Sequence, residues 1–79
     1  MITIYGTRGC GFCKMAAAKC AKMNLKYEYK DISIRKWYLE LKSLVDYDFN
    51  IPKIFIDDTY IGDYADFVEY IQEQLIEKS

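Results

Sequence analysis

The segment ITIYGTRGCGFCKM, residues 2–15, places two cysteines three positions apart just after a short apolar run. Residues 2–5 are β-branched or aromatic and end at Gly6, a pattern typical of a short buried strand. Residues 11–23 are rich in alanine, lysine and methionine, which favour helix, and their apolar positions recur at helical spacing. The segment therefore predicts a strand, then a loop that carries Cys10, then a helix that begins beside that cysteine.

The rest of the chain continues this alternation of strand and helix patterns. We expect a strand over residues 26–31, then a helix from Ile34 that is capped by Ser33, and then a loop through residues 46–50. After this loop we expect two strands, over residues 52–56 and 59–61, that are joined by a turn at Asp57 and Asp58. A helix over residues 64–75 should close the chain. The apolar faces of the last two helices are predicted to be Ile34, Trp37, Tyr38, Leu41, Leu44 and Val45, and then Tyr64, Phe67, Val68, Ile71 and Leu75. The order βαβαββα predicts an α/β fold with a four-stranded mixed sheet flanked by three helices.

The length and composition are typical of one globular domain over residues 1–79. Hydrophobic residues make up 52% of the chain, which is enough for a compact core without a structural metal or several disulfides. With 11 basic and 12 acidic residues, the net charge of -1 gives no electrostatic reason to expect a nucleic-acid partner. No apolar run reaches the roughly 18 residues that span a bilayer, and the N-terminal residues lack the order of a secretory signal. We therefore expect a cytoplasmic protein that does not bind membranes.

The cysteine pair has three interpretations: a metal site, a structural disulfide or a redox-active dithiol. Histidine is absent, which excludes Cys-His catalytic pairs and histidine-containing zinc sites. Only Cys20 remains as a further thiolate ligand, so a zinc site within one chain is not expected. A structural disulfide across so short a loop would restrict the unfolded chain little, and it would not persist in the cytoplasm. Thiol-disulfide exchange is therefore the favoured interpretation.

The spacing of the two cysteines assigns their roles. Cys10 is expected at a helix start, where free N–H groups and the helix dipole stabilise a thiolate, with Arg8 and Lys14 acting in the same direction. Cys13 lies one helical turn further along, close enough to attack a mixed disulfide on Cys10. We predict that Cys10 is the exposed nucleophile and Cys13 the shielded resolving thiol. Cys20 falls on nearly the same helical face as Cys13, which predicts a small buried side chain.

Three segments in the expected order resemble the glutaredoxins, the small branch of the thioredoxin fold. They are IYGTRGCGFC (residues 4–13), NIPKIFID (50–57) and YIGDYADF (60–67). The resemblance implies a thioredoxin-like fold, a cis bond between Ile51 and Pro52, and an Ile51 backbone that faces Cys10 and pairs with a bound peptide. It also implies that the Ala65 backbone and Asp66 hold the γ-glutamyl end of glutathione. The glutathione-binding residues expected from this resemblance are Arg8, Phe12, Ile51, Pro52, Ala65 and Asp66.

The chain departs from the family pattern at two places. Gly11 and Phe12 stand between the cysteines, where the family usually has Pro-Tyr. Their presence resembles family members that hold a [2Fe-2S] cluster between two chains, with Cys10 then a metal ligand. Asp63 stands where the family has its second glycine, and a carboxylate is unfavourable beside an anionic peptide site. Asp63 therefore keeps open an alternative in which thioredoxin reductase, not glutathione, supplies the electrons.

The resemblance implies a glutathione-dependent thiol-disulfide oxidoreductase that reduces protein or glutathione mixed disulfides. Glutathione would be the co-substrate, and no bound cofactor is expected unless the cluster alternative holds. Couples of this family lie near about -200 to -230 mV, where the cytosolic glutathione pool can keep the pair reduced. The compact chain resembles the forms that donate electrons to ribonucleotide reductase in deoxyribonucleotide synthesis, and a monomer is expected.

Overall fold

The computed structural model of the chain describes residues 1–46 and 50–78, with side chains through residue 73. The elements are β1 (Ile2–Gly6), α1 (Gly11–Lys22), β2 (Tyr27–Asp31), α2 (Arg35–Leu44), β3 (Lys53–Ile56), β4 (Thr59–Gly62) and α3 (Tyr64–Lys78). Their order is the predicted βαβαββα. No helix within the described ranges is long and apolar enough to cross a membrane.

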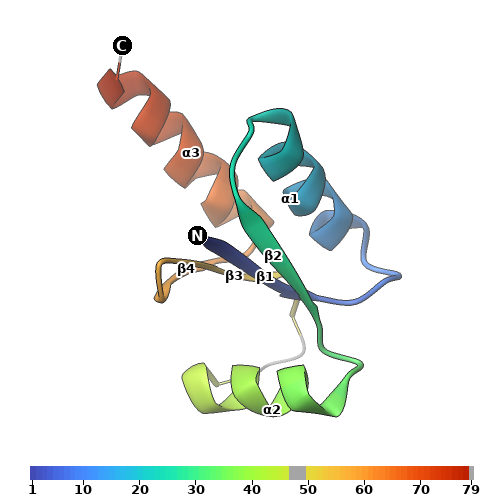
Figure 1. Ribbon diagram of the computed structural model, residues 1–79. Coiled ribbons are helices and arrows are strands. Elements are labelled where there is room, and N and C mark those ends of the chain that lie inside the picture. The colour runs from blue at the N-terminus through green and yellow to red at the C-terminus, as the bar shows by residue number, and fades with distance from the viewer. Residues whose placement is uncertain (47–49, 79) are drawn as a thin grey trace.

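The four strands form one mixed sheet in the order β2-β1-β3-β4. Strand β1 runs parallel to β2 and antiparallel to β3, and β4 pairs antiparallel with β3. Helices α1 and α3 lie on one side of the sheet, and α2 lies alone on the other side (Figure 1). This arrangement confirms the predicted α/β fold with a four-stranded mixed sheet and three helices. It also brings the carboxyl end of β1 and the start of α1 to one edge of the molecule.

The larger core lies between the sheet and the pair α1 and α3. Its buried members are Ile2, Ile4, Ala16, Cys20, Ile54, Phe67 and Ile71. Because side chains alternate along a strand, the isoleucines of β1 face this core while Tyr5 faces α2. Burying each large apolar side chain of this kind stabilises the fold by about 1.5–3 kcal/mol. Cys20 is fully buried among them, which confirms its predicted place in the core.

Helix α2 is held on the sheet by fewer apolar contacts and by a polar network. Leu41 is its one fully buried residue. The Glu40 carboxylate accepts hydrogen bonds from the Tyr5 hydroxyl at 2.6 Å and from Lys30 Nζ at 2.7 Å. The Lys30 ammonium also lies 4.5 Å from the centre of the Trp37 ring. Strands β1 and β2 therefore fix α2 partly through a cation shared by a carboxylate and an aromatic ring.

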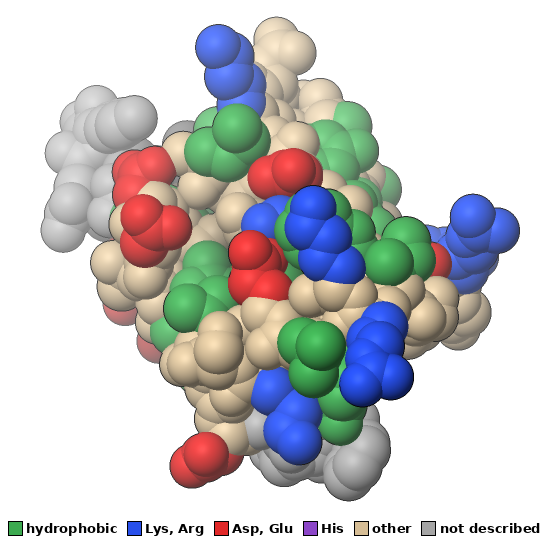
Figure 2. Space-filling view, turned by 60° about the horizontal axis from the view of Figure 1, so that its bottom comes forward, with side chains coloured by type: hydrophobic (Ala, Val, Ile, Leu, Met, Phe, Trp, Pro, Cys, Tyr) green, Lys and Arg blue, Asp and Glu red, His purple; other side chains and the backbone are tan. Residues whose placement is uncertain are grey.

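Two residues predicted for the apolar face of α2 are exposed instead. Ile34 is 51% exposed and Leu44 is 53% exposed. Ile34 is exposed because it is the extended N-cap residue and lies outside the helix. Leu44 lines an open pocket of about 390 Å³ between the last turn of α2 and the sheet. In the view that brings the α2 side forward, apolar side chains lie between Lys and Arg side chains (Figure 2).

The predicted cap at Ser33 was wrong. The Asp31 Oδ1 atom accepts hydrogen bonds from the Ser33 N–H at 2.9 Å and from its hydroxyl at 2.7 Å. The serine hydroxyl is thus engaged in a turn that follows β2, a common alternative for short polar side chains. Ile34 occupies the N-cap position of α2 without a side-chain hydrogen bond.

The hairpin and the last helix follow the sequence prediction. Asp57 and Asp58 have φ values of 47° and 69°, which is the left-handed conformation of a two-residue hairpin turn. Phe67 and Ile71 of α3 are buried, and Tyr64 and Val68 are half-buried. The side chain of Leu75 and most of the predicted loop over residues 46–50 lie outside what the structure describes.

Candidate active site

Cys10 is the residue that starts helix α1. Its backbone is extended, with φ -88° and ψ 114°, and its Sγ accepts a hydrogen bond from the Cys13 N–H at 3.3 Å. The Cys10 side chain is half-buried, and the first turn of α1 carries no acidic residue. A thiolate at this position receives a backbone N–H and the positive end of the helix dipole without a competing carboxylate in that turn.

Cys13 lies behind Cys10 and is shielded from solvent, as predicted. Its side chain is fully buried. Burial, together with a hydrogen bond to Cys10, raises the pKa of the Cys13 thiol to about 12. All three cysteines of the chain are free thiols, and burial also raises the pKa of Cys20. The two thiols of the pair therefore differ in their access to solvent.

The segment before β3 lies against Cys10. The Ile51–Pro52 peptide bond is cis, which confirms the expectation from the resemblance. The Cys10 thiol donates toward the Ile51 carbonyl oxygen, with Sγ 3.9 Å from that oxygen. Pro52 is fully buried, whereas Ile51 is half-buried. The structure thus brings residues 10 and 51 together across the sheet edge.

Phe12 forms part of the surface around the cysteine pair. Its side chain is 59% exposed, and its ring centre lies 5.9 Å from that of Tyr64 in a tilted arrangement. This contact joins the first turn of α1 to the first residue of α3. Aromatic pairs of this geometry contribute about 0.5–1.5 kcal/mol beyond their area burial.

The start of α3 is closed by two reciprocal hydrogen bonds. The Asp66 N–H donates to Asp63 Oδ1 at 3.1 Å, and the Asp63 N–H donates to Asp66 Oδ2 at 3.2 Å. This is the arrangement of a capping box, in which each carboxylate satisfies a free N–H group of the helix start. Gly62 has φ 132°, and a Cβ at that position would overlap the Asp66 carboxylate. Asp63 therefore has a structural role as a helix cap, and the neighbouring Ala65 is exposed in the first turn.

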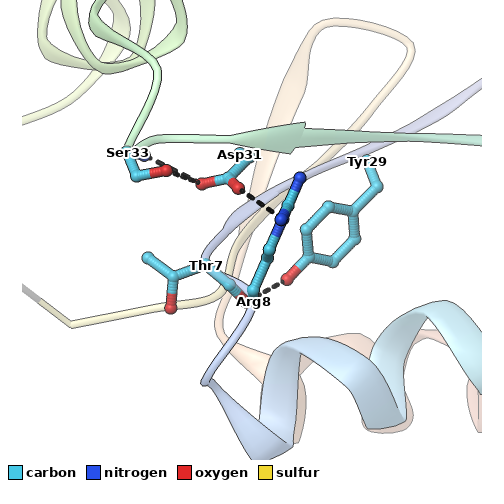
Figure 3. A network of polar contacts seen from close by, with 5 residues as sticks. All are labelled: Thr7, Arg8, Tyr29, Asp31 and Ser33. Atoms are coloured by element: carbon cyan, nitrogen blue, oxygen red, sulfur yellow. Dashed lines mark hydrogen bonds and ion pairs between the residues drawn. The ribbon is translucent and has the colours of Figure 1, made fainter.

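Arg8 lies beside β2 and not along the start of α1. Its Nε is 3.7 Å from Asp31 Oδ2, and its side chain is 96% exposed. Hydrogen bonds from Ser33 are the main cause that lowers the pKa of Asp31, and the charge of Arg8 adds to them. Figure 3 shows Arg8 extended toward Asp31, with Tyr29 beside it. The predicted support of the Cys10 thiolate by Arg8 is not seen, because the charge of Arg8 is directed to the end of β2.

Comparison with known proteins shows where this site belongs. The family model described as Glutaredoxin matches residues 2–61. The chain belongs to the glutaredoxin family. Glutaredoxin 1 of Escherichia coli strain K12 is 32% identical over 80 residues, covering 91% of this chain and 93% of the relative. The glutaredoxin of Vibrio cholerae serotype O1 is 34% identical over 82 residues, covering 94% of this chain and 93% of the relative.

Solved glutaredoxin structures share the fold. The structure of reduced E. coli glutaredoxin has a TM-score of 0.72 at 30% identity and covers 94% of this chain and 95% of that one. A buckwheat glutaredoxin-glutathione complex has a TM-score of 0.71 at 15% identity and covers 92% of this chain and 69% of that one. The predicted thioredoxin-like fold is confirmed, and the glutaredoxin family makes this chain a thiol-disulfide oxidoreductase.

Three contacts of the site were not predicted from the sequence. The Asp63 cap had a local signal, because an Asp-x-x-Asp pattern stood directly before an apolar helix. The contact of Phe12 with Tyr64 and the approach of Tyr29 to Cys13, described below, join residues from different elements. Neither has a signal in local spacing.

Proposed function

We propose that this glutaredoxin reduces protein disulfides and glutathione mixed disulfides in the cytoplasm, with Cys10 as nucleophile, Cys13 as resolving thiol and glutathione as reductant. The observation that carries these roles is the asymmetry of the pair. The Cys10 side chain is half-buried and its sulfur accepts the Cys13 N–H, while the Cys13 side chain is fully buried one turn behind it. An external disulfide can reach only the first of the two.

The reaction consists of two exchanges. The Cys10 thiolate attacks one sulfur of the substrate disulfide, the substrate S–S bond breaks, and the departing thiolate takes up a proton. Cys13 then attacks the Cys10 sulfur of the mixed disulfide, and the second substrate thiol leaves as the Cys10–Cys13 disulfide forms. Two glutathione molecules restore the dithiol and are themselves oxidised to glutathione disulfide.

Three observations support glutathione as the reductant. The Ile51 carbonyl oxygen lies 3.9 Å from Cys10 Sγ, the place where the resemblance puts the backbone of a bound peptide. Asp66 stands at the start of α3 beside Gly62, where the resemblance puts the γ-glutamyl end. The buckwheat glutaredoxin, which shares the fold, was solved as a complex with glutathione.

The decisive experiment supplies electrons from one source at a time. Reduced glutathione with glutathione reductase, or thioredoxin reductase alone, is the only reductant in a disulfide-reduction assay. We expect turnover with glutathione and none above background with thioredoxin reductase. The reverse result would replace glutathione by the thioredoxin reductase alternative.

Variants of the two thiols test their roles. Cys13→Ser should still exchange with small glutathione mixed disulfides but should accumulate a covalent adduct with protein disulfides, because no internal thiol releases it. Cys10→Ser should abolish both reactions. Mass spectrometry of the reaction mixtures detects the adduct, and normal turnover of Cys10→Ser would remove Cys10 from its assigned role.

For the protein substrate, we propose ribonucleotide reductase, on the basis of the resemblance to compact family members that donate electrons to it. The test is deoxyribonucleotide formation with this protein and glutathione as the only electron supply. The alternative with a [2Fe-2S] cluster rests on Gly11 and Phe12. Anaerobic reconstitution followed by a visible spectrum and size-exclusion chromatography would detect a coloured dimer, whereas we expect a colourless monomer.

A further inference from the structure

The hydroxyl of Tyr29 lies behind the active-site loop. Tyr29 is in β2, paired in parallel register with Ile4 of β1, and its half-buried ring packs against the larger core. The hydroxyl donates a hydrogen bond to the Thr7 carbonyl oxygen at 2.6 Å (Figure 3). Thr7 directly follows β1 and precedes Cys10 in the loop. The tyrosine thus reaches from the neighbouring strand to the segment that carries the nucleophile.

The same hydroxyl shares a small space with the sulfur of Cys13. A Cβ at Gly6 would overlap the Cys13 sulfur and would lie 2.9 Å from the Tyr29 hydroxyl oxygen. Because glycine has no Cβ, the space beside residue 6 is filled by the Cys13 thiol and the Tyr29 hydroxyl. The backbone of Thr7 and, to a smaller extent, the Tyr29 side chain lower the pKa of Cys13, against the larger raising effect of burial.

The groups near this buried thiol come from the start of α1, from β2 and, in the case of Thr7, from the loop after β1. Cys10 at the start of α1 raises the pKa of Cys13, both by hydrogen bonding and by its charge. Tyr29 comes from β2, and burial followed by the charge of Cys13 raises its own pKa, so the hydroxyl keeps its proton at neutral pH. Asp31 at the end of β2 acts on Tyr29 in the same direction and is itself paired with Arg8.

These opposing influences change when Cys10 reacts. In a mixed disulfide the Cys10 sulfur carries no negative charge and no thiol proton, so its unfavourable effect on a Cys13 thiolate disappears. The favourable effects of the Thr7 backbone and the Tyr29 side chain on a Cys13 thiolate remain. A hydroxyl has one proton and donates it to the stronger acceptor, and a thiolate is a far stronger acceptor than a thiol.

We infer that Tyr29 is a further catalytic residue of the resolving step, and that its hydroxyl turns from the Thr7 carbonyl oxygen to the Cys13 sulfur as that sulfur becomes a thiolate. The inference rests on the resolving role proposed for Cys13. In the step, the Cys13 S–H bond breaks, the Cys10–Cys13 bond forms, and the bond from Cys10 to the substrate sulfur breaks. The proton of Cys13 passes to the departing thiolate or to water. Tyr29 transfers no proton and stabilises the attacking sulfur by donation alone.

The test separates the two exchanges with an aromatic disulfide, 5,5′-dithiobis(2-nitrobenzoate). Its first coloured thiolate is released when Cys10 attacks, and its second is released when Cys13 resolves the mixed disulfide. Tyr29→Phe keeps the ring and removes the donor. We expect the first release to be unchanged and the second to slow about tenfold at neutral pH, the effect that one hydrogen bond to a charged group supports. The pH at which the second release reaches half its maximal rate should move upward.

Matched variants isolate the effect. Tyr27→Phe removes an exposed hydroxyl from the same strand and should leave both releases unchanged. Melting curves check that Tyr29→Phe is folded at the assay temperature. Cys13→Ser should abolish the second release in either background. If the second release persists in Cys13→Ser, the proposed resolving role itself fails.

Two outcomes would overturn the role of Tyr29 while leaving the resolving role intact. One is a second release in Tyr29→Phe with the parent rate and the parent pH profile. The other is an equal slowing of both releases, which would indicate a general displacement of the loop and no specific action on Cys13.

Discussion

At the scale of single residues, Gly6 leaves space for the Cys13 thiol and the Tyr29 hydroxyl. A Cβ there would overlap the Cys13 sulfur and crowd the Tyr29 hydroxyl, although the backbone of Gly6 lies in an ordinary strand. Gly6→Ala should therefore cost about 1–3 kcal/mol of stability by overpacking. It should also slow the release of substrate from mixed disulfides, because the resolving sulfur must move. Thermal denaturation and mixed-disulfide kinetics measure the two effects, and parent behaviour in both would show that the space is not required.

The different environments of the three thiols predict the order of their alkylation. Cys10 is partly accessible and accepts a backbone N–H, whereas burial raises the pKa of Cys13 to about 12 and raises that of Cys20. Because the thiolate is the reactive form, iodoacetamide at mildly acidic pH should label Cys10 first. Peptide mapping by mass spectrometry identifies the labelled residue. Earlier labelling of Cys13 or Cys20 would reverse the assigned roles.

At the scale of elements, Asp63 combines a structural role with an unfavourable charge. Its carboxylate caps the Asp66 N–H at 3.1 Å, at the helix start where the glutathione carboxylate is proposed to dock. Asp63→Asn keeps a capping side chain and removes the charge, while Asp63→Ala removes both. The structure thus provides a pair of variants that separates capping from charge.

We expect Asp63→Asn to retain the parent melting temperature and to improve the apparent glutathione constant at most about fivefold, because an exposed charge contributes no more than about 1 kcal/mol. The gain should shrink as salt is added. Asp63→Ala should lose about 1 kcal/mol of stability through the missing cap. Kinetics with glutathione as sole reductant and melting curves provide the measurements.

Substitution of Asp66 is expected to weaken glutathione use, in contrast to Asp63→Asn. Asp66→Ala removes a proposed partner of the γ-glutamyl amine and should weaken glutathione use more than the Asn variant strengthens it. Unchanged glutathione kinetics in both Asp63→Asn and Asp66→Ala would contradict docking at α3 and favour the thioredoxin reductase alternative.

At the scale of the whole molecule, helix α2 depends on Glu40 for its attachment to the sheet. Hydrogen bonds from Lys30 and then from Tyr5 lower the pKa of Glu40 from its ordinary value of 4.5. A carboxyl group whose pKa is lower in the folded state stabilises the fold above its unfolded pKa, and this stabilisation is lost as the pH falls through the folded pKa. The attachment of α2 should therefore weaken in acid, beginning near pH 4.5.

The corresponding test uses Glu40→Gln. Its melting temperature should be below that of the parent at neutral pH, and the difference should shrink as the pH falls below 4.5. Because the Glu40 side chain is 39% exposed, we expect a modest effect. Glu69→Gln on α3, whose side chain is also exposed, is the control. A constant difference between Glu40→Gln and parent across this pH range would show that its charge does not stabilise α2.

The sequence by itself determined the order of elements, the helix that begins beside Cys10 and the glutaredoxin family. The order of elements and the helix start depend on neighbours in the chain, because periodicity and the spacing of the two cysteines are local properties, whereas the family came from the resemblance of three segments. Cys20 and the hairpin turn at Asp57 and Asp58 were predictable for the same reason. The predicted cap at Ser33 was wrong because a turn with Asp31 competed for the same hydroxyl.

Only the tertiary structure decided which distant residues meet. The Tyr29 hydroxyl at Thr7 and the ion pair of Arg8 with Asp31 join residues 22 and 23 positions apart, whereas the approach of Ile51 to Cys10 was expected from the resemblance. Contacts of this kind depend on how the strands are ordered in the sheet, and the periodicity of the sequence does not predict them. The exposure of Leu44, which lines an open pocket beside the sheet, was likewise decided by packing, because a helix buries only the apolar side chains that a neighbouring element covers; Ile34 is exposed as the N-cap residue outside α2.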